Sequence, residues 1–133
     1  MTVADNLRVL LAQEECHTMP CCFDALSAKL IQQEGYPLTF MSGFATSAAR
    51  IGAPDLGLMS YSEVLDQARN ITDAIDIPLI GDGDTGYGNA MNVRRTVSGF
   101  AKAGCAAMRP LRCFSSASSE RGQSWRAPRR RHS

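Results

Sequence analysis

Short apolar segments alternate with amphipathic helical patterns through the first hundred residues, and this alternation constrains the fold more than any other feature. Three segments have the length and apolar composition of buried strands: residues 18–23, 38–41 and 78–82. Apolar residues recur at helical spacing in four other segments: residues 3–14, 24–34, 60–75 and 93–103. Because no hairpin turn separates the predicted strands, they should form a parallel sheet covered by helices.

Strand–helix units of this size are typical of a (β/α)8 barrel, in which catalytic groups lie at the carboxyl ends of the strands. Such a barrel needs about 250 residues, whereas this chain has 133. The sequence therefore predicts an α/β fold, namely the N-terminal part of a TIM barrel, truncated after about three βα units and confined to residues 1–106.

Two local features of this fold also follow from the sequence. Residues 43–59 contain three glycines and a proline, so they are predicted to be a long functional loop with room for a short helical piece. No apolar run follows Ala106. The strand that contains Ile80 is therefore predicted to have an unpaired edge.

Two aspartates come directly after the third predicted strand, within the glycine-rich segment 78–89. Asp82 and Asp84 are two residues apart, so in an extended chain their carboxylates point to the same side. Two like charges held together need a counter-charge, and Mg2+ is commonly bound by one or two carboxylates with waters and substrate oxygens. The glycines of the segment leave room for a ligand beside the ion. The sequence predicts a metal site at the carboxyl end of this strand.

Other interpretations of this segment are weaker. Its glycine spacing fits a dinucleotide-binding loop, but the two aspartates would repel a pyrophosphate, and no acidic residue follows about 20 positions later. An EF-hand loop beginning at Asp82 fails at its sixth position, Tyr87, and at its twelfth, Val93. An ordinary acidic turn rich in glycine stays open as long as the segment is considered alone.

Several further segments, in the same order along the chain, resemble one enzyme family. The resemblance extends from about residue 3 to residue 106 and is to the isocitrate lyase and phosphoenolpyruvate mutase superfamily. The matching segments are FDALSA at 23–28, MSG at 41–43, PDLG at 54–57, GDGDTGYG at 81–88 and NVRRTV at 92–97. A set of ordered segments over some hundred residues is far more specific than any one of them.

The resemblance implies an Mg2+-dependent enzyme, with Mn2+ able to replace Mg2+, that acts on small 2-oxo or 2-hydroxy di- and tricarboxylates through an enolate. It would break a carbon–carbon bond or, as the mutases do, rearrange a P–C bond. In the family, the aspartate that matches Asp84 binds the metal more directly, and the one that matches Asp82 supports it through water. Ser42 and Gly43 match a pair that binds the carboxylate or oxo end of the substrate. Asp55 matches a residue of the active-site loop.

Phe44 follows the Ser42-Gly43 pair where methylisocitrate lyases have a further glycine. An aromatic residue here is similar to the oxaloacetate-processing, dimethylmalate-type and plant carboxyphosphonate-mutase-like branches, which makes Phe44 a candidate substrate-binding residue. The alternative is a loop aromatic that packs against its neighbours, since aromatic side chains bury large apolar areas. Both interpretations stay open.

The resemblance ends near Ala106. Family members continue with an apolar strand ending in Glu-Asp and with a loop carrying the catalytic Cys-Gly-His; neither follows here, so no catalytic residue is assigned. Residues 109–133 hold 7 of the 14 basic residues and 1 of the 13 acidic residues, and residues 107–133 are predicted to be a disordered Ser/Arg-rich tail that is out of frame. The alternative to a lyase or mutase is a non-catalytic truncated remnant or a gene-model artefact with no independent function.

The composition argues against several other classes of protein. The five cysteines have neither C-x-x-C nor paired Cys/His spacing, which disfavours a zinc site or a disulfide framework. No apolar run approaches the about 18 residues of a membrane span, and the basic tail has only Phe114 and Trp125 to stack on bases. We expect a cytoplasmic protein without nucleic-acid or membrane partners, whose partner is a small carboxylic acid. Full-length relatives are homo-oligomeric, a state not expected for this fragment.

Overall fold

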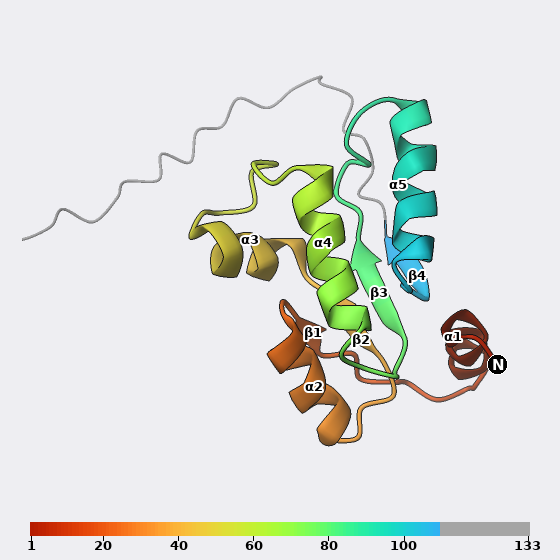
Figure 1. Ribbon diagram of the computed structural model, residues 1–133. Coiled ribbons are helices and arrows are strands. Elements are labelled where there is room, and N and C mark those ends of the chain that lie inside the picture. The colour runs from red at the N-terminus through yellow and green to blue at the C-terminus, as the bar shows by residue number, and fades with distance from the viewer. Residues whose placement is uncertain (110–133) are drawn as a thin grey trace, which may run out of the picture.

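The computed structural model describes residues 1–109, which form a mixed α/β fold around one sheet (Figure 1). The elements, in chain order, are α1 (Val3–Leu11), β1 (Cys21–Cys22), α2 (Ala25–Gln33), β2 (Thr39–Met41), α3 (Gly43–Ile51), α4 (Tyr61–Thr72), β3 (Leu79–Asp82), α5 (Ala90–Lys102) and β4 (Ala107–Arg109). The strands lie in the order β1-β2-β3-β4, and every neighbouring pair is parallel. All four carboxyl ends therefore lie along one edge of the sheet.

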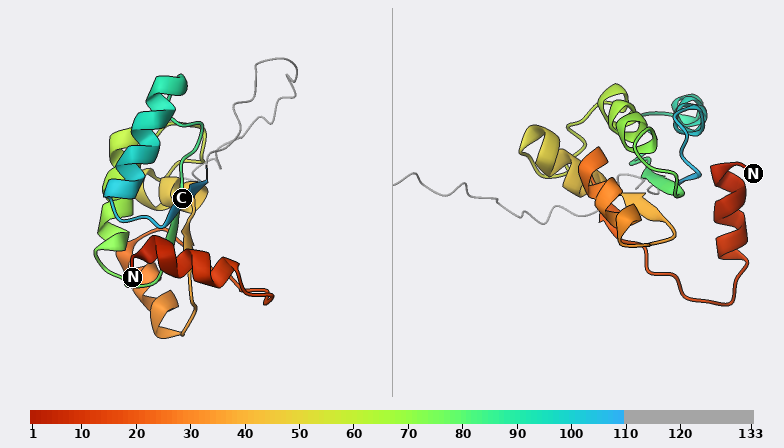
Figure 2. Two further views of the ribbon diagram at one scale, coloured as in Figure 1. Left: turned by 90° about the vertical axis from the view of Figure 1, so that its right-hand side faces the viewer. Right: turned by 60° about the horizontal axis from the view of Figure 1, so that its bottom comes forward.

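Helices α2, α4 and α5 form a row on one face of the sheet, and α1 lies apart from that row (Figure 2). The core lies between the row and the sheet, where Met41 and Leu79 are buried with Phe100 of α5. Gly81 of β3 faces the same side, because a Cβ atom there would come within 2.5 Å of the Phe100 ring. Since neighbouring residues in a strand point to opposite faces, Asp82 points away from these helices.

Polar residues begin four of the helices. The N-cap residues of α2, α3, α4 and α5 each accept a hydrogen bond from a backbone N–H with their side chain; they are Asp24, Ser42, Ser60 and Asn89. Ser42 directly follows β2, so the start of α3 lies at the carboxyl edge of the sheet.

The predicted order of strands and helices is confirmed, as is the α/β class with a parallel sheet. The prediction of a long loop from residue 43 is wrong in part, because residues 43–51 form a nine-residue helix. Ser42 caps the start of this helix, and Gly52 ends it in the left-handed conformation with φ 64°. The glycine that suggested a loop is therefore a helix stop signal.

The prediction that the strand containing Ile80 has an unpaired edge is wrong, because a fourth strand follows the three βα units. Strand β4 pairs with β3 in the register Ile80 with Ala107, Gly81 with Met108 and Asp82 with Arg109. The backbone N–H of Gly83 also donates to the Arg109 carbonyl over 2.9 Å. A strand of three residues that ends in arginine is too short to show an apolar pattern from which it could be predicted. Its pairing depends on backbone hydrogen bonds, which every residue except proline can form.

This fourth strand lies beyond the boundary predicted at residue 106, while the rest of the predicted tail, residues 110–133, lies outside the described residues. The longest helix of the described part, α5, has 13 residues. Nowhere in residues 1–109 is a helix both long enough and apolar enough to cross a membrane.

Candidate active site

A cavity opens at the carboxyl ends of β2 and β3, on the edge where the sequence predicted a site. It is lined by Gly43, Asp55, Gly57, Met59, Val64, Asp82, Asp84 and Tyr87. Four of the predicted site residues thus come together: Gly43 from the start of α3, Asp55 from the segment before α4, and the two aspartates at and after the end of β3. Residues 39 positions apart in the chain become neighbours because β2 and β3 pair in parallel.

The Asp82 carboxylate is fixed by backbone donors on both of its oxygens. The N–H of Gly43 donates to Oδ2 over 3.2 Å, and the N–H of Asp84 donates to Oδ1 over 3.1 Å. These two backbone donors hold the carboxylate in one orientation. Each oxygen keeps a further lone-pair direction free for another donor or a cation.

Gly43 permits a close approach that no other residue would allow. A Cβ atom built on it would lie 2.9 Å from Oδ2 of Asp82 and 3.1 Å from Oδ2 of Asp55. Because Gly43 has no side chain, the carboxylates of Asp55 and Asp82, which come from different segments, can both approach its backbone.

Asp84 lies in a strained turn directly after the strand. Its φ is 46°, in the left-handed region that aspartate tolerates better than most residues. Within the described residues no donor reaches its side-chain oxygens. In contrast to Asp82, its carboxylate therefore has all of its acceptor capacity available for a ligand.

The carboxylates of the cavity perturb the acid–base behaviour of their neighbours. Burial, followed by the charges of Asp84 and Asp82, raises the pKa of the Asp55 carboxyl above its ordinary value. Burial, followed by the charges of Asp84, Asp82 and Asp55, also raises the pKa of the Tyr87 phenol. The cavity thus concentrates negative charge and keeps Tyr87 protonated.

These residues fit a hard divalent cation held by one or two carboxylates. In the part of the chain that the structure describes, no three His, Cys, Asp or Glu side chains converge as a complete ligand set. Mg2+ does not require one, since it retains several waters and takes oxygens from its substrate. Asp84, with its unused oxygens, is the residue best suited to direct binding, and Asp82 is suited to support.

Ser42 and Phe44 occupy different positions from the other predicted residues. The Ser42 hydroxyl oxygen accepts a hydrogen bond from the Ala45 N–H over 3.3 Å and so caps α3. Phe44 lies on the helix α3 instead of in a loop and is 64% exposed, so among the described residues it is not packed against its neighbours. Neither residue is among those that line the cavity in the described part of the chain.

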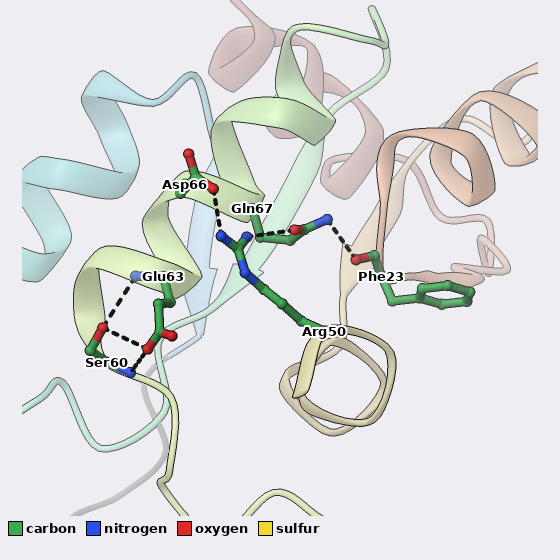
Figure 3. Close-up of polar contacts among 6 residues, drawn as sticks. All are labelled: Phe23, Arg50, Ser60, Glu63, Asp66 and Gln67. Atoms are coloured by element: carbon green, nitrogen blue, oxygen red, sulfur yellow. Dashed lines mark hydrogen bonds and ion pairs between the residues drawn. The ribbon is translucent and has the colours of Figure 1, made fainter. Parts of the chain in front are cut away.

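Helix α3, which presents Gly43 to the cavity, is attached to α4 by Arg50 (Figure 3). The Arg50 guanidinium donates to Asp66 over 2.7 Å and to Gln67 over 2.8 Å. The Gln67 amide in turn donates to the Phe23 carbonyl, just past β1, over 2.9 Å. This chain of contacts links the end of β1, α4 and α3.

Tyr87 is a site residue that the sequence analysis did not select. It has φ 61°, which is uncommon for a bulky residue. Its loop is held by Thr96 of α5, whose hydroxyl donates to the Gly86 carbonyl over 3.0 Å. The sequence did contain a signal for this site residue: Tyr87 is a large aromatic residue between two glycines, and ordinary turns seldom contain one at such a position.

A parallel sheet with polar groups gathered at its carboxyl edge has the architecture of α/β enzymes that bind ligands at this edge. The family model described as phosphoenolpyruvate phosphomutase matches residues 7–109. The chain therefore belongs to the phosphoenolpyruvate phosphomutase family, within the isocitrate lyase and phosphoenolpyruvate mutase superfamily, and the predicted resemblance is confirmed.

Curated relatives include both lyases and a mutase. The chain is 41% identical over 106 residues to 2,3-dimethylmalate lyase from Eubacterium barkeri, a match covering 80% of this chain and 37% of the relative. It is 45% identical over 103 residues to oxaloacetate decarboxylase from Paraburkholderia xenovorans, covering 77% and 34%. It is 45% identical over 98 residues to the chloroplastic carboxyvinyl-carboxyphosphonate phosphorylmutase of Arabidopsis thaliana, covering 73% and 29%. The chain thus spans about a third of the length of these relatives.

Solved structures agree with this assignment. Phosphonopyruvate hydrolase in complex with oxalate and Mg2+ superimposes with a TM-score of 0.77 at 38% identity, over 81% of this chain and 38% of that one. Oxaloacetate acetylhydrolase superimposes with a TM-score of 0.76 at 36% identity, over 80% and 39%.

Proposed function

We propose that this chain carries the metal- and substrate-binding part of an Mg2+-dependent carbon–carbon lyase or P–C mutase, with Mn2+ able to replace Mg2+. The substrates proposed are small 2-oxo or 2-hydroxy di- and tricarboxylates that react through an enolate. The observation that carries this proposal is the pair Asp82 and Asp84 at one strand end, with the Asp82 carboxylate held by the Gly43 N–H. The oxalate and Mg2+ in the structure of phosphonopyruvate hydrolase support it.

The roles proposed for Gly43, Asp55, Asp82 and Asp84 rest on their place in the cavity, and those proposed for Ser42 and Phe44 rest on the family resemblance. When bound, Mg2+ would stabilise the negative charge that develops on the enolate oxygens. Asp84 would hold the ion, and Asp82 would orient its water ligands from a fixed position. The start of α3, at Ser42 and Gly43, would accommodate the carboxylate or oxo end of the substrate, since a helix N-terminus favours negative charge. Phe44 and Asp55 would border the same substrate.

Tyr87 is given a role that depends on its proton. Because burial and three carboxylates raise the pKa of its phenol, the hydroxyl stays protonated over the whole physiological range. It can then donate a hydrogen bond to a developing oxyanion but cannot act as a base. None of the described residues that line the cavity is a Cys, His or Lys.

The lack of Cys, His and Lys among the described cavity residues favours a second proposal for the 133-residue chain. In this proposal the chain binds metal and oxo acid but does not catalyse a reaction. Among the described residues of the cavity, only the Asp55 carboxyl has a pKa raised toward neutral pH. Such a cavity can bind an enolate mimic but offers few groups for acid–base chemistry. The two proposals agree on binding and differ on turnover.

Binding and turnover are therefore tested separately on the 133-residue chain. Calorimetry with oxalate should show binding in Mg2+ that EDTA abolishes; oxalate binding unaffected by EDTA would contradict the metal site. Pyruvate release from oxaloacetate and from 2,3-dimethylmalate is then followed with Mg2+, using Asp84→Asn at the same Mg2+ concentration to correct for decarboxylation by the free ion. Release above that control assigns catalysis to the chain, and release equal to the control supports the non-catalytic alternative.

A further inference from the structure

A basic groove runs between α4 and α5, on the outside of the helix row. It encloses about 370 Å3 and is lined by Tyr61, Ser62, Leu65, Arg69, Arg95, Ser98, Gly99 and Lys102. Residues 1–108 contain 7 basic and 12 acidic residues, yet three of those basic residues and none of the acidic ones line this groove. The charge of the groove is thus opposite to that of the surrounding protein.

The two walls are stripes at helical spacing. On α5, Arg95, Ser98 and Lys102 lie at i, i+3 and i+7, and on α4, Ser62 and Arg69 lie seven apart. Residues at these spacings share one face of a helix. All five are exposed, so the charged and hydroxyl ends are accessible to a ligand.

The floor of the groove holds Arg95 in place. The Tyr61 ring lies directly against Gly99, where no other residue would leave room for its hydroxyl. The Arg95 guanidinium carbon lies 5.4 Å from the centroid of that ring, which is the distance of a cation–π contact. Stacking leaves the edge of the guanidinium free to donate hydrogen bonds.

Helix dipoles explain only part of this arrangement. Arg69 and Lys102 lie in the last turns of their helices, where a cation is favourable in any protein. Arg95 lies in the first half of α5, where the dipole offers no such stabilisation. Among the described residues, none of the three forms an ion pair with a carboxylate. Their convergence in one groove would suit an external anion.

We propose that this groove binds a chain of phosphoryl groups, as found in inorganic polyphosphate or in a nucleoside di- or triphosphate. Arg95 and Lys102 are seven residues apart, about 10 Å along the helix, so two or three linked phosphoryl groups can meet both cations without either side chain bending toward the other. Arg69 completes the cationic wall, and the Ser62 and Ser98 hydroxyls supply neutral donors. This proposal is independent of the function proposed for the carboxylate cavity.

The test is calorimetric titration of the full 133-residue chain with inorganic tripolyphosphate in EDTA, which removes divalent ions from the carboxylate cavity. Orthophosphate, ADP and ATP are titrated in parallel to distinguish the sources of the phosphoryl chain. We expect tripolyphosphate to bind at least fivefold more tightly than orthophosphate. Tighter binding of ATP than of tripolyphosphate would identify a nucleotide as the ligand.

Variants then locate the binding. Arg95→Gln and Lys102→Gln should each weaken tripolyphosphate binding at least fivefold, and Ser62→Glu, which places a negative charge in the groove, should abolish it. Glutamate in the first turn of a helix favours folding, so loss of binding in Ser62→Glu reports on the groove. Arg94→Gln is the matched control, because Arg94 is exposed on the same helix but does not line the groove; it should change affinity less than twofold.

Three results would overturn the proposal. The first is an equal loss of affinity in Arg94→Gln and Arg95→Gln, which would indicate a general charge effect. The second is the absence of tripolyphosphate binding. The third is binding that survives Ser62→Glu and so involves other basic residues, including those of segment 109–133.

Discussion

The backbone N–H of Gly43 donates a hydrogen bond to Oδ2 of Asp82 over 3.2 Å, so the residue that begins α3 directly orients the residue that ends β3. This contact joins the Ser-Gly segment and the aspartate segment, which are far apart in the chain and are proposed to bind substrate and metal respectively. It forms because β2 and β3 are parallel neighbours in register.

Gly43→Ala should weaken metal binding more than it weakens the fold. The added Cβ would lie 2.9 Å from Oδ2 of Asp82, so the carboxylate has to move. We expect about a tenfold loss of Mn2+ affinity, as for other changes that misplace a group supporting a metal. Gly52→Ala is the control, since Gly52 has φ 64° and open space around it. It should lower stability by about 1 kcal/mol and leave Mn2+ affinity unchanged, and equal effects of the two variants on affinity would refute this account.

Ser42→Ala should have two separate effects. Loss of the N-cap of α3 should cost about 1 kcal/mol of stability. Loss of a hydroxyl partner for the carboxylate should weaken oxalate binding by a further 1–3 kcal/mol, on the order of a buried unpaired oxygen. Ser60→Ala removes the equivalent cap from α4 and should reproduce only the stability loss. Oxalate titrations of both variants decide the matter: identical affinities would mean that Ser42 acts as a cap alone.

Arg50→Ala should loosen α3. The pair with Asp66 is partly exposed, with side-chain exposures of 32% and 55%, so its contribution is about 0–1 kcal/mol. The same guanidinium also donates to Gln67, and we therefore expect faster hydrogen exchange of the α3 backbone amides while the strand amides stay protected. Arg8→Ala, which breaks the more exposed pair with Asp5, should leave α3 exchange unchanged. Unaltered exchange of α3 in Arg50→Ala would show that the helix is held by other contacts.

The cysteines report on the packing of the sheet. Cys16 and Cys21 are exposed, whereas Cys22 and Cys105 are buried. Burial, with the nearby Cys22 thiol, raises the pKa of Cys105 to about 12. At pH 8 only about one in ten thousand Cys105 side chains is then a thiolate, which is the form that reacts with alkylating reagents.

In a Cys113→Ser background, iodoacetamide should therefore modify two thiols quickly, and Cys105 only after the protein unfolds. Peptide mass spectrometry identifies the modified sites. Rapid alkylation of Cys105 at pH 8 in the absence of denaturant would mean that α5 does not cover β3 as described.

Periodicity was sufficient to predict the elements whose apolar faces are buried. Val64, Ala68 and Ile71 of α4 are buried at helical spacing, and buried residues alternate along β3. The aspartates of the site were predictable for a different reason: few local structures need two carboxylates two residues apart beside several glycines. Family resemblance then added Ser42, Gly43 and Asp55, which no local pattern distinguishes.

The remaining features depend on tertiary context. Strand β4 forms through backbone hydrogen bonds to β3. Such bonds do not depend on the side chains, so the sequence pattern does not reveal them. Helix α3 was obscured by Gly52, which ends it and so looks like part of a loop. The pKa of Tyr87 is raised in part by three carboxylates from two separate segments, and only the folded chain brings these groups together.

Mn2+ binding to the 133-residue chain, followed by electron paramagnetic resonance, tests the central claim most directly. The wild-type chain should bind one Mn2+ that Mg2+ displaces. Asp84→Asn should weaken binding by more than about 100-fold, and Asp82→Asn by about tenfold, as expected for a supporting residue. Asp76→Asn makes the same chemical change in an exposed residue before the start of β3 and should have no effect. Equal Mn2+ affinities of Asp84→Asn and Asp76→Asn would contradict the assignment of the metal site to the carboxyl end of β3.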